Sequence, residues 1–206
     1  MKYRIGIDEA WRGAWAWPVV AWAFCTNLDF DFSIFPGLTD SKKLTPKDRE
    51  RLFSLIQENS AWNGCFFASG SIDANTIDVL GIREANRLAM QSALHQVLEN
   101  ISQSEVSEIL IDGRDNYWFD DIDHHKVRYI VWGDLTEKCI SAASIIAKVT
   151  RDRRMCDFSV EYKGFHFDLH KGYGTRKHQE ALMVYDITPI HRKSYAPIKR
   201  LISDES

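Results

Sequence analysis

The sequence predicts an α/β fold in which helices flank one sheet. Short apolar runs, rich in β-branched and aromatic residues, alternate with longer segments whose apolar residues recur every three or four positions. The 206 residues suffice for one sizeable core, whereas two complete domains would be cramped. Because the chain contains no repeat, linker or low-complexity stretch, we expect a single domain over residues 1–206.

Five segments are expected to form strands. The first, YRIGIDE, follows directly on the N-terminus, and a loop with Pro36 and Gly37 comes after the second. The expected strands are residues 3–9, 19–26, 64–72, 107–112 and 127–133.

Four segments are expected to form helices. Thr45 followed by Pro46 is typical of a capped helix start. Residues 82–101 have the clearest amphipathic pattern, and the small residues of 136–155 suit close packing against a sheet. The expected helices are 46–58, 82–101, 136–155 and 175–185.

The composition changes after residue 164 and becomes basic, aromatic and glycine-containing. We therefore expect a sheet core over about 1–160 and a helical, basic extension over about 161–206.

Composition and charge argue against several classes of protein. No apolar run approaches the ~18 residues that span a bilayer, and MKYRIGIDEA lacks the core of a signal peptide, so we expect a cytoplasmic protein without a membrane partner. The four cysteines form no CxxC pair, which favours four buried free thiols over a zinc site or disulfides. The net charge of -3 does not indicate a nucleic-acid binder, although basic patches can be hidden in the sum.

Acidic residues stand at matching strand ends. Asp8 and Glu9 end the first expected strand, Asp112 ends the fourth, and Asp134 lies just past the fifth. Side chains at the ends of adjacent strands converge on one crevice, where acids repel one another unless a cation is present. Carboxylates suit Mg²⁺ or Mn²⁺, and a pair of such ions can promote phosphodiester cleavage.

The competing interpretation is that each acid is a solvated turn residue. Asp8 and Glu9 are strand neighbours, which point to opposite faces, so they share a site only if the strand ends or twists there. The pattern alone leaves both interpretations open.

Two segments combine cations with features that suit nucleic acid. LHKGYGTRKH at 169–178 offers glycines for close approach, Tyr173 for stacking, and Lys171, Arg176 and Lys177 for phosphates. DSKKLTPKDRER at 40–51 is similarly basic. An exposed turn or a solvated helix face explains either segment as well.

Two further pairs of residues carry side chains that could take part in chemistry. Ser144 and Lys148, four apart on the expected helix 136–155, can face the same crevice, although ordinary interior and surface positions explain them too. His124 and His125 lie in an acidic loop without a matching partner, which argues against a metal site there.

Taken together, the motifs resemble those of the ribonuclease HII family from residue 4 to about 197. They follow the family's order: GIDEA at 6–10, RG at 12–13, PVV at 18–20, DSKKL at 40–44, IDG at 111–113, GD at 133–134, SAASIIAKVTRDR at 141–153 and HKGYGT at 170–175.

The resemblance implies an RNase H-like fold, with a five-stranded mixed sheet flanked by helices and a helical C-terminal extension. It also implies endonucleolytic cleavage of the RNA strand of RNA–DNA hybrids, and of single ribonucleotides embedded in duplex DNA, by a monomer that uses Mn²⁺ or Mg²⁺. The implied catalytic metal ligands are Asp8, Glu9, Asp112 and Asp134.

The resemblance also implies a set of substrate-binding residues. The segment Trp11-Arg12-Gly13 stands in place of a Gly-Arg-Gly loop whose backbone reads the 2′-hydroxyl, and Tyr173 matches a tyrosine that stacks at the ribonucleotide junction. The full set is Trp11, Arg12, Gly13, Ser41, Lys42, Lys43, Ser144, Lys148, His170, Lys171 and Tyr173.

The departures from the family concentrate near the N-terminus. Trp11 and Trp17 stand where the family usually has glycine, and Trp22 replaces a small residue in a strand that should pack tightly. Two interpretations besides an active enzyme follow. One is a catalytically impaired relative that binds hybrids without cleaving them; the other is a different two-metal nuclease such as a junction resolvase, against which HKGYGT and AASIIAKV argue.

A further hypothesis concerns the tryptophans themselves. The chain has seven tryptophans and eleven glycines, whereas average usage predicts roughly fourteen glycines. UGA is a stop codon in the standard code, tryptophan in some variant codes and glycine in others, so a UGA-as-glycine gene read with a tryptophan table would show this pattern. The competing explanation is a divergent enzyme with a rebuilt loop. The candidates are Trp11 and Trp17, then Trp22, with Trp62, Trp118 and Trp132 undecided.

Overall fold

A computed structural model describes residues 1–60 and 64–204 and contains a five-stranded mixed sheet in the order β3-β2-β1-β4-β5. The central strand β1 runs antiparallel to β2 and parallel to β4. The strands are β1 (Tyr3–Ala10), β2 (Val19–Asn27), β3 (Cys65–Ile72), β4 (Val106–Asp112) and β5 (Val127–Ile130). The predicted α/β fold with five strands is confirmed.

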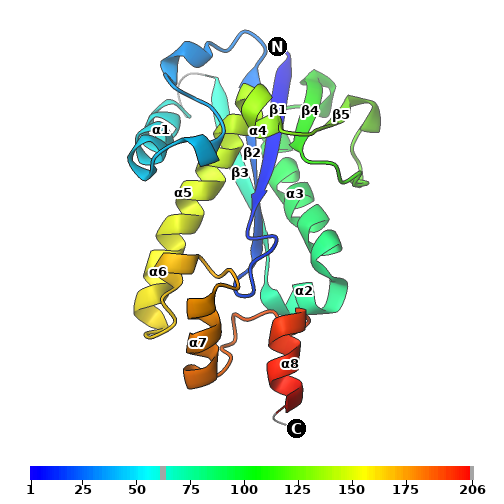
Figure 1. Ribbon diagram of the computed structural model, residues 1–206. Coiled ribbons are helices and arrows are strands. Elements are labelled where there is room, and N and C mark those ends of the chain that lie inside the picture. The colour runs from blue at the N-terminus through cyan, green and yellow to red at the C-terminus, as the bar shows by residue number, and fades with distance from the viewer. Residues whose placement is uncertain (61–63, 205–206) are drawn as a thin grey trace.

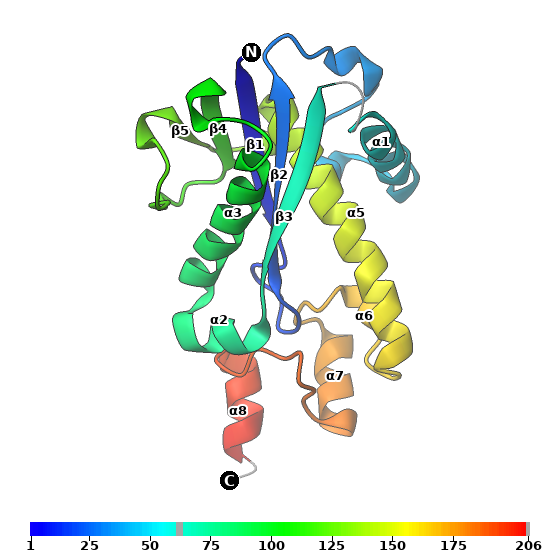
Figure 2. The ribbon, with the colours of Figure 1, turned by 180° about the vertical axis from the view of Figure 1, so that it is seen from behind.

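Helices cover both faces of this sheet. One face lies against α3, with α2 at its start, and the other against α5, with α1 beside it (Figures 1 and 2). The helices are α1 (Pro46–Asn59), α2 (Ala74–Leu80), α3 (Ile82–Leu98), α4 (Gly133–Thr136), α5 (Lys138–Glu161), α6 (Phe167–His170), α7 (Arg176–Tyr185) and α8 (Ala196–Asp204). Short 3-10 turns lie at Phe32–Ile34, Ser41–Lys43, Gln103–Glu105 and His124–Lys126. In the parts of the chain that the structure describes, no helix is both long and apolar enough to span a bilayer.

Several element boundaries differ from those expected. β5 ends at Ile130 rather than 133, because Trp132 adopts a left-handed conformation (φ 61°) that leads into α4. The expected helix 136–155 becomes α4 followed by α5, which continues to Glu161. The helices α2, α6 and α8 were not expected, and α8 lies in the basic tail.

The cysteines correct one expectation. Cys25, Cys65 and Cys139 are buried free thiols, as predicted, but Cys156 is exposed, so the prediction of four buried thiols is wrong for that residue.

The close approach of α5 to β1 depends on Gly6. A Cβ added at Gly6 would lie 2.4 Å from the carbonyl carbon of Cys139, far inside contact distance. The start of α5 therefore lies directly on the backbone of β1, as the small-residue composition of this helix predicted. This contact fixes where the later turns of α5 stand relative to the end of β1.

The C-terminal helices lie beyond the end of the sheet and beside residues 11–17, hereafter the 11–17 loop (Figure 1). Loop and extension share one hydrophobic cluster, which contains Trp11, Phe167 and Leu182. An isolated β-bridge also joins Ala16 to His191. The extension therefore packs directly against the segment that joins β1 to β2.

The Gly6 contact generates a stability prediction. Gly6→Ala should lower the free energy of unfolding by about 1–3 kcal/mol, or the Tm by roughly 2–12 °C, because the backbones of β1 and α5 must separate. Gly13→Ala is the control: its Cβ would lie 3.7 Å from Tyr173 Cε1, an ordinary contact, so the Tm should barely change. Equal Tm values for the two variants, measured by thermal unfolding, would contradict this packing argument.

Candidate active site

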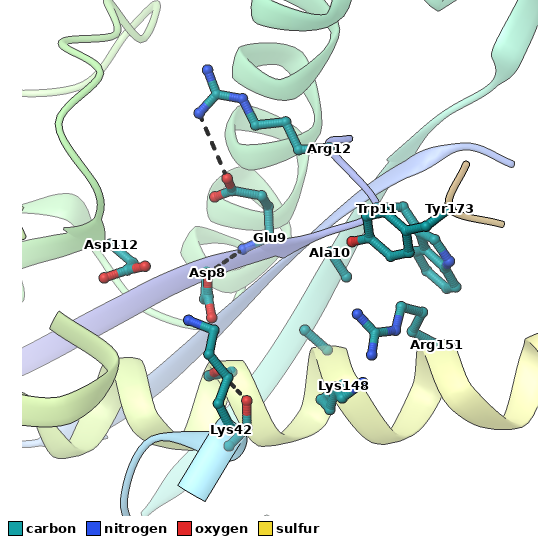
Figure 3. A pocket seen from close by; sticks show the side chains of 13 residues that line it. Asp8, Glu9, Ala10, Trp11, Arg12, Lys42, Asp112, Lys148, Arg151 and Tyr173 are labelled. Atoms are coloured by element: carbon teal, nitrogen blue, oxygen red, sulfur yellow. Dashed lines mark hydrogen bonds and ion pairs between the residues drawn. The ribbon is translucent and has the colours of Figure 1, made fainter. Parts of the chain in front are cut away.

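A cavity of about 320 Å³ lies at the carboxyl ends of β1 and β4. Because these two strands are parallel neighbours, Asp8 and Glu9 near the end of one lie at the same edge as Asp112 at the end of the other (Figure 3). The lining residues are Asp8, Glu9, Ala10, Trp11, Arg12, Ser41, Lys42, Asp112, Ser144, Ala147, Lys148, Arg151 and Tyr173.

Asp134 is brought to the same edge by the turn after β5. The backbone N–H groups of Gly133 and Asp134 donate to Asp112 Oδ1 at 2.8 and 3.4 Å, which ties α4 to the end of β4. Asp134 itself is buried, and Lys42 Nζ donates to its Oδ2 at 3.1 Å. Asp134 therefore does not line the cavity but lies behind Lys42, which does.

Asp8 and Glu9 diverge, as strand geometry requires. Glu9 points toward Arg12, whose Nη1 lies 3.8 Å from Glu9 Oε1, whereas Asp8 points toward Lys42 and α5 (Figure 3). Their link is local: the backbone N–H of Glu9 donates to Asp8 Oδ1 at 2.7 Å. The strand does not end before Glu9, so the two side chains approach the cavity from opposite faces of β1.

Burial and mutual repulsion raise the pKa values of Asp8, Glu9 and Asp112. Burial raises the pKa of Asp8 well above its usual range, and the charges of Glu9 and Asp112 raise it further. Burial also raises the pKa of Glu9, to about 7, against the opposing effect of Arg12. The pKa of Asp112 is raised by burial and then by Asp134. A cation among these oxygens would relieve both effects.

The donor chemistry fits Mg²⁺ or Mn²⁺, which prefer carboxylate oxygens and water. Within residues 1–60 and 64–204, however, no three His, Cys, Asp or Glu side chains are grouped so as to hold an ion. The divergence of Asp8 from Glu9 and the pairing of Asp134 with Lys42 account for this spacing.

Basic and aromatic side chains form the opposite wall. Lys148 Nζ and Arg151 Nη2 lie 3.3 and 2.9 Å from Asp152 Oδ1, so both cations stand on one turn of α5. The guanidinium of Arg151 lies 6.0 Å from the centre of the Tyr173 ring. Arg151 was not predicted from the sequence, although it lies within the AASIIAKVTRDR segment and one turn beyond Lys148.

Some predicted site residues lie outside the cavity. Gly13 stands beside it against Tyr173, whereas Lys43 is exposed elsewhere on its 3-10 turn. Lys171 Nζ donates to the carbonyl of Asp168. His170 is buried beneath the Tyr173 segment, where its Nε2 donates to Phe165 O at 2.7 Å.

His170 belongs to a buried histidine cluster with His178 and His191. His178 Nδ1 donates to Tyr173 O at 3.1 Å, so its Nε2 accepts the hydrogen bond from His191 Nε2 at 3.0 Å. Burial lowers the pKa of His178 to about 3 and that of His191 to about 4, so both rings are neutral. The cluster supports the backbone that carries Tyr173.

Arg192 is the positioning residue that sequence reasoning missed. Its side chain is fully buried, and it donates to Trp11 O at 2.7 Å, to Arg12 O at 2.9 Å and to Trp17 O at 2.9 Å. Tyr195 adds a hydrogen bond from its hydroxyl to Arg12 O at 2.7 Å. The only signal in the sequence was a basic tail, which does not reveal that one arginine serves three carbonyls of the 11–17 loop.

The chain matches one known protein family over nearly its whole length. The profile of the family described as Ribonuclease HII matches residues 5–198. The chain is 42% identical to the ribonuclease HII of Dichelobacter nodosus over 199 residues, which covers 97% of each protein. It is 42% identical to that of Halorhodospira halophila, with 96% of this chain and 94% of the relative covered.

Solved structures agree on the fold. The ribonuclease H2 of Pyrococcus horikoshii has a TM-score of 0.77 at 24% identity, with 98% of each chain covered. Bst-RNase HIII in complex with Mn²⁺ has a TM-score of 0.74 at 17% identity, with 98% of this chain and 70% of that chain covered. Together with the family match, the carboxylate-lined cavity leads to one conclusion: this chain belongs to the ribonuclease HII family of divalent-metal-dependent endonucleases, which degrade RNA in RNA–DNA hybrids.

Proposed function

We propose that this cavity hydrolyses a phosphodiester bond at a ribonucleotide, both in RNA–DNA hybrids and at single ribonucleotides embedded in duplex DNA. The observation that carries the proposal is the convergence of Asp8, Glu9 and Asp112 on one cavity, with their pKa values raised by burial and mutual repulsion. Asp134 completes the proposed ligand set from behind Lys42. These four carboxylates would hold Mg²⁺ or Mn²⁺, which would supply activation of water and stabilisation of the leaving oxygen.

The protein's own residues position the substrate. The backbone of the 11–17 loop borders the cavity next to the carboxylates, where it can approach a 2′-hydroxyl. Tyr173 presents a ring to the same space, where it can stack on the sugar or base at the junction with deoxyribonucleotide. Lys42, Lys148 and Arg151 line the same cavity, which supports a role for them in contacting phosphates.

The proposed products are a 3′-hydroxyl on the DNA side and a 5′-phosphate on the ribonucleotide. The described cavity wall has no Cys or His, and its two serines, Ser41 and Ser144, hydrogen-bond to each other at 3.0 Å, which supports direct attack by water. All four carboxylates are retained, which favours an enzyme over a relative that only binds hybrids. We also propose that the chain acts as one cytoplasmic, monomeric domain, in which the extension is held to the sheet core through the shared cluster.

Metal dependence gives the first test of this function. Cleavage of a duplex with one ribonucleotide should need Mg²⁺ or Mn²⁺, and Asp112→Asn should abolish cleavage while hybrid binding persists, because the basic wall is unchanged. Asp120→Asn, which alters an exposed carboxylate outside the cavity, should cleave normally. Cleavage at the parent rate by Asp112→Asn, or full activity in excess chelator, would refute the assignment.

The role of Tyr173 can be tested by comparing a variant that lacks the aromatic ring with one that keeps it. Tyr173→Ala should lower kcat/KM on the single-ribonucleotide duplex by about 5- to 150-fold, since stacking contributes about 1–3 kcal/mol per base. Tyr173→Phe keeps the ring and should retain most activity. If both variants lost activity equally, the result would contradict a stacking role for the Tyr173 ring.

Arg192 gives a test of loop positioning. Arg192→Lys should weaken binding of the single-ribonucleotide duplex and lower the Tm by several degrees, because one ammonium cannot span three carbonyls and charge-assisted hydrogen bonds contribute about 1.5–3 kcal/mol each. The control is Arg176→Lys, whose exposed side chain pairs only with Glu180. Unchanged binding by Arg192→Lys would show that the loop holds its shape without the guanidinium.

A further inference from the structure

Three tryptophans occupy a backbone conformation that bulky residues avoid. φ is 67° at Trp11, 92° at Trp17 and 61° at Trp132. In the described chain the other non-glycine residues with positive φ are Asp121, His166, Lys171 and Asp186. Tryptophan thus supplies three of seven such positions although only seven of 206 residues are tryptophan, and a large aromatic residue is among the least suited to left-handed backbone.

The side chain of Trp11 is poorly accommodated. It is 2% exposed, and its indole N–H is buried without a hydrogen-bond partner, although buried tryptophans ordinarily find one. The ring of Trp17 has its centre only 4.1 Å from that of Phe158 at a tilt of 45°, closer than aromatic pairs prefer. Both positions therefore combine an unfavourable backbone with an unfavourable side-chain environment.

The backbone at positions 11 and 17 is held by contacts that need no side chain. Trp11 O and Trp17 O accept hydrogen bonds from Arg192, and Trp17 N–H donates to Ile190 O at 2.7 Å. Glycine would make the same three hydrogen bonds and adopts positive φ without strain. The hydrogen bonds hold the backbone in this conformation, and only the side chains at 11 and 17, from Cβ outward, conflict with it.

Trp15 is the contrasting case within the same loop. It lies outside the left-handed region, and its ring lies on Gly174, where an added Cβ would come within 2.0 Å of Trp15 Cζ2. It also packs against His178, with ring centres 5.6 Å apart. The surroundings of position 15 therefore accommodate a tryptophan, because Gly174 leaves room for its ring.

Among the described residues, Trp22 and Trp118 do not have positive φ. Trp22 lies in β2, in extended conformation, so its buried and unpaired indole N–H does not by itself demand glycine. Trp118 stacks on His124 with ring centres 3.7 Å apart. Trp62 lies outside the described residues.

We infer that glycine is the residue the cell inserts at positions 11, 17 and 132, from UGA codons that its ribosomes decode as glycine. The chain has eleven glycines, and three more would make fourteen, which is about what average usage near 7% predicts. Glycine at 11 also removes a bulky ring from the wall of the cavity, beside Tyr173 (Figure 3). The inference stands on backbone geometry and does not rest on the proposed function.

The gene and its product give the direct test. Codons 11, 17 and 132 should be UGA, codon 15 should be UGG, and a peptide covering residues 5–30 of protein isolated from its own organism should have the mass expected for glycine at 11 and 17. UGG at codons 11 and 17, or tryptophan in that peptide, overturns the inference.

Recombinant variants give an independent test. At 11 and at 17, Trp→Gly should keep or raise the Tm and exceed Trp→Ala by roughly 2–4 °C, because alanine is strained at positive φ and glycine is not. Trp15→Gly and Trp15→Ala are the matched controls: both should lose several degrees, with alanine at least as stable as glycine. The same ranking of alanine and glycine at all three positions, or losses at 11 and 17 as large as at 15, would overturn the inference.

A binding measurement distinguishes failure of this inference from failure of the proposed function. The Trp11→Gly, Trp17→Gly double variant should bind a single-ribonucleotide duplex at least tenfold more tightly than the printed sequence, whereas Trp15→Gly should not. If the stability ranking holds but no variant binds the duplex, the proposed function fails and the inference about glycine stands.

Discussion

The contact between Gly6 of β1 and the first turns of α5 is the constraint on which the site depends. Because no side chain separates the two backbones, α5 runs close along the central strand, and Ser144, Lys148 and Arg151 arrive beside the end of that strand. The parallel pairing of β1 with β4 adds Asp112 at the same edge. The packing of β4 and α5 against β1 thus gives the cavity one acidic wall and one basic wall.

The electrostatics of this edge follow from burial rather than from any single pair. Asp8, Glu9 and Asp112 are each penalised first by desolvation and then by a neighbouring carboxyl, so the metal-free protein holds these groups at raised pKa values. Arg12 and Lys42 relieve the charge only in part, since both are substantially exposed. Burying several carboxyls at one edge costs stability, and carboxyls with perturbed pKa values cluster at functional sites.

The sequence was informative where function follows from position on a strand. Asp8, Glu9 and Asp112 were candidates because side chains at the ends of adjacent strands converge, and the family resemblance favoured them over solvated turns. The structure brings all three to one cavity through the parallel pairing of β1 with β4. The sequence was uninformative where function depends on backbone atoms: nothing marked Arg192, because the carbonyls that it binds have no sequence signature. It also placed the end of β5 too late, since tryptophan at 132 gives no sign of the left-handed turn that carries Asp134 to the site.

The hydrogen bonds of Arg192 join the two ends of the chain, across 175 to 181 residues of sequence. The 11–17 loop is synthesised before Arg192, which holds it, and before His191, which bridges to Ala16. During synthesis the sheet and its carboxylates can form while the loop still lacks its donors. In a nascent chain the acidic edge of the sheet is therefore complete in sequence before the 11–17 loop gains the guanidinium that holds its backbone.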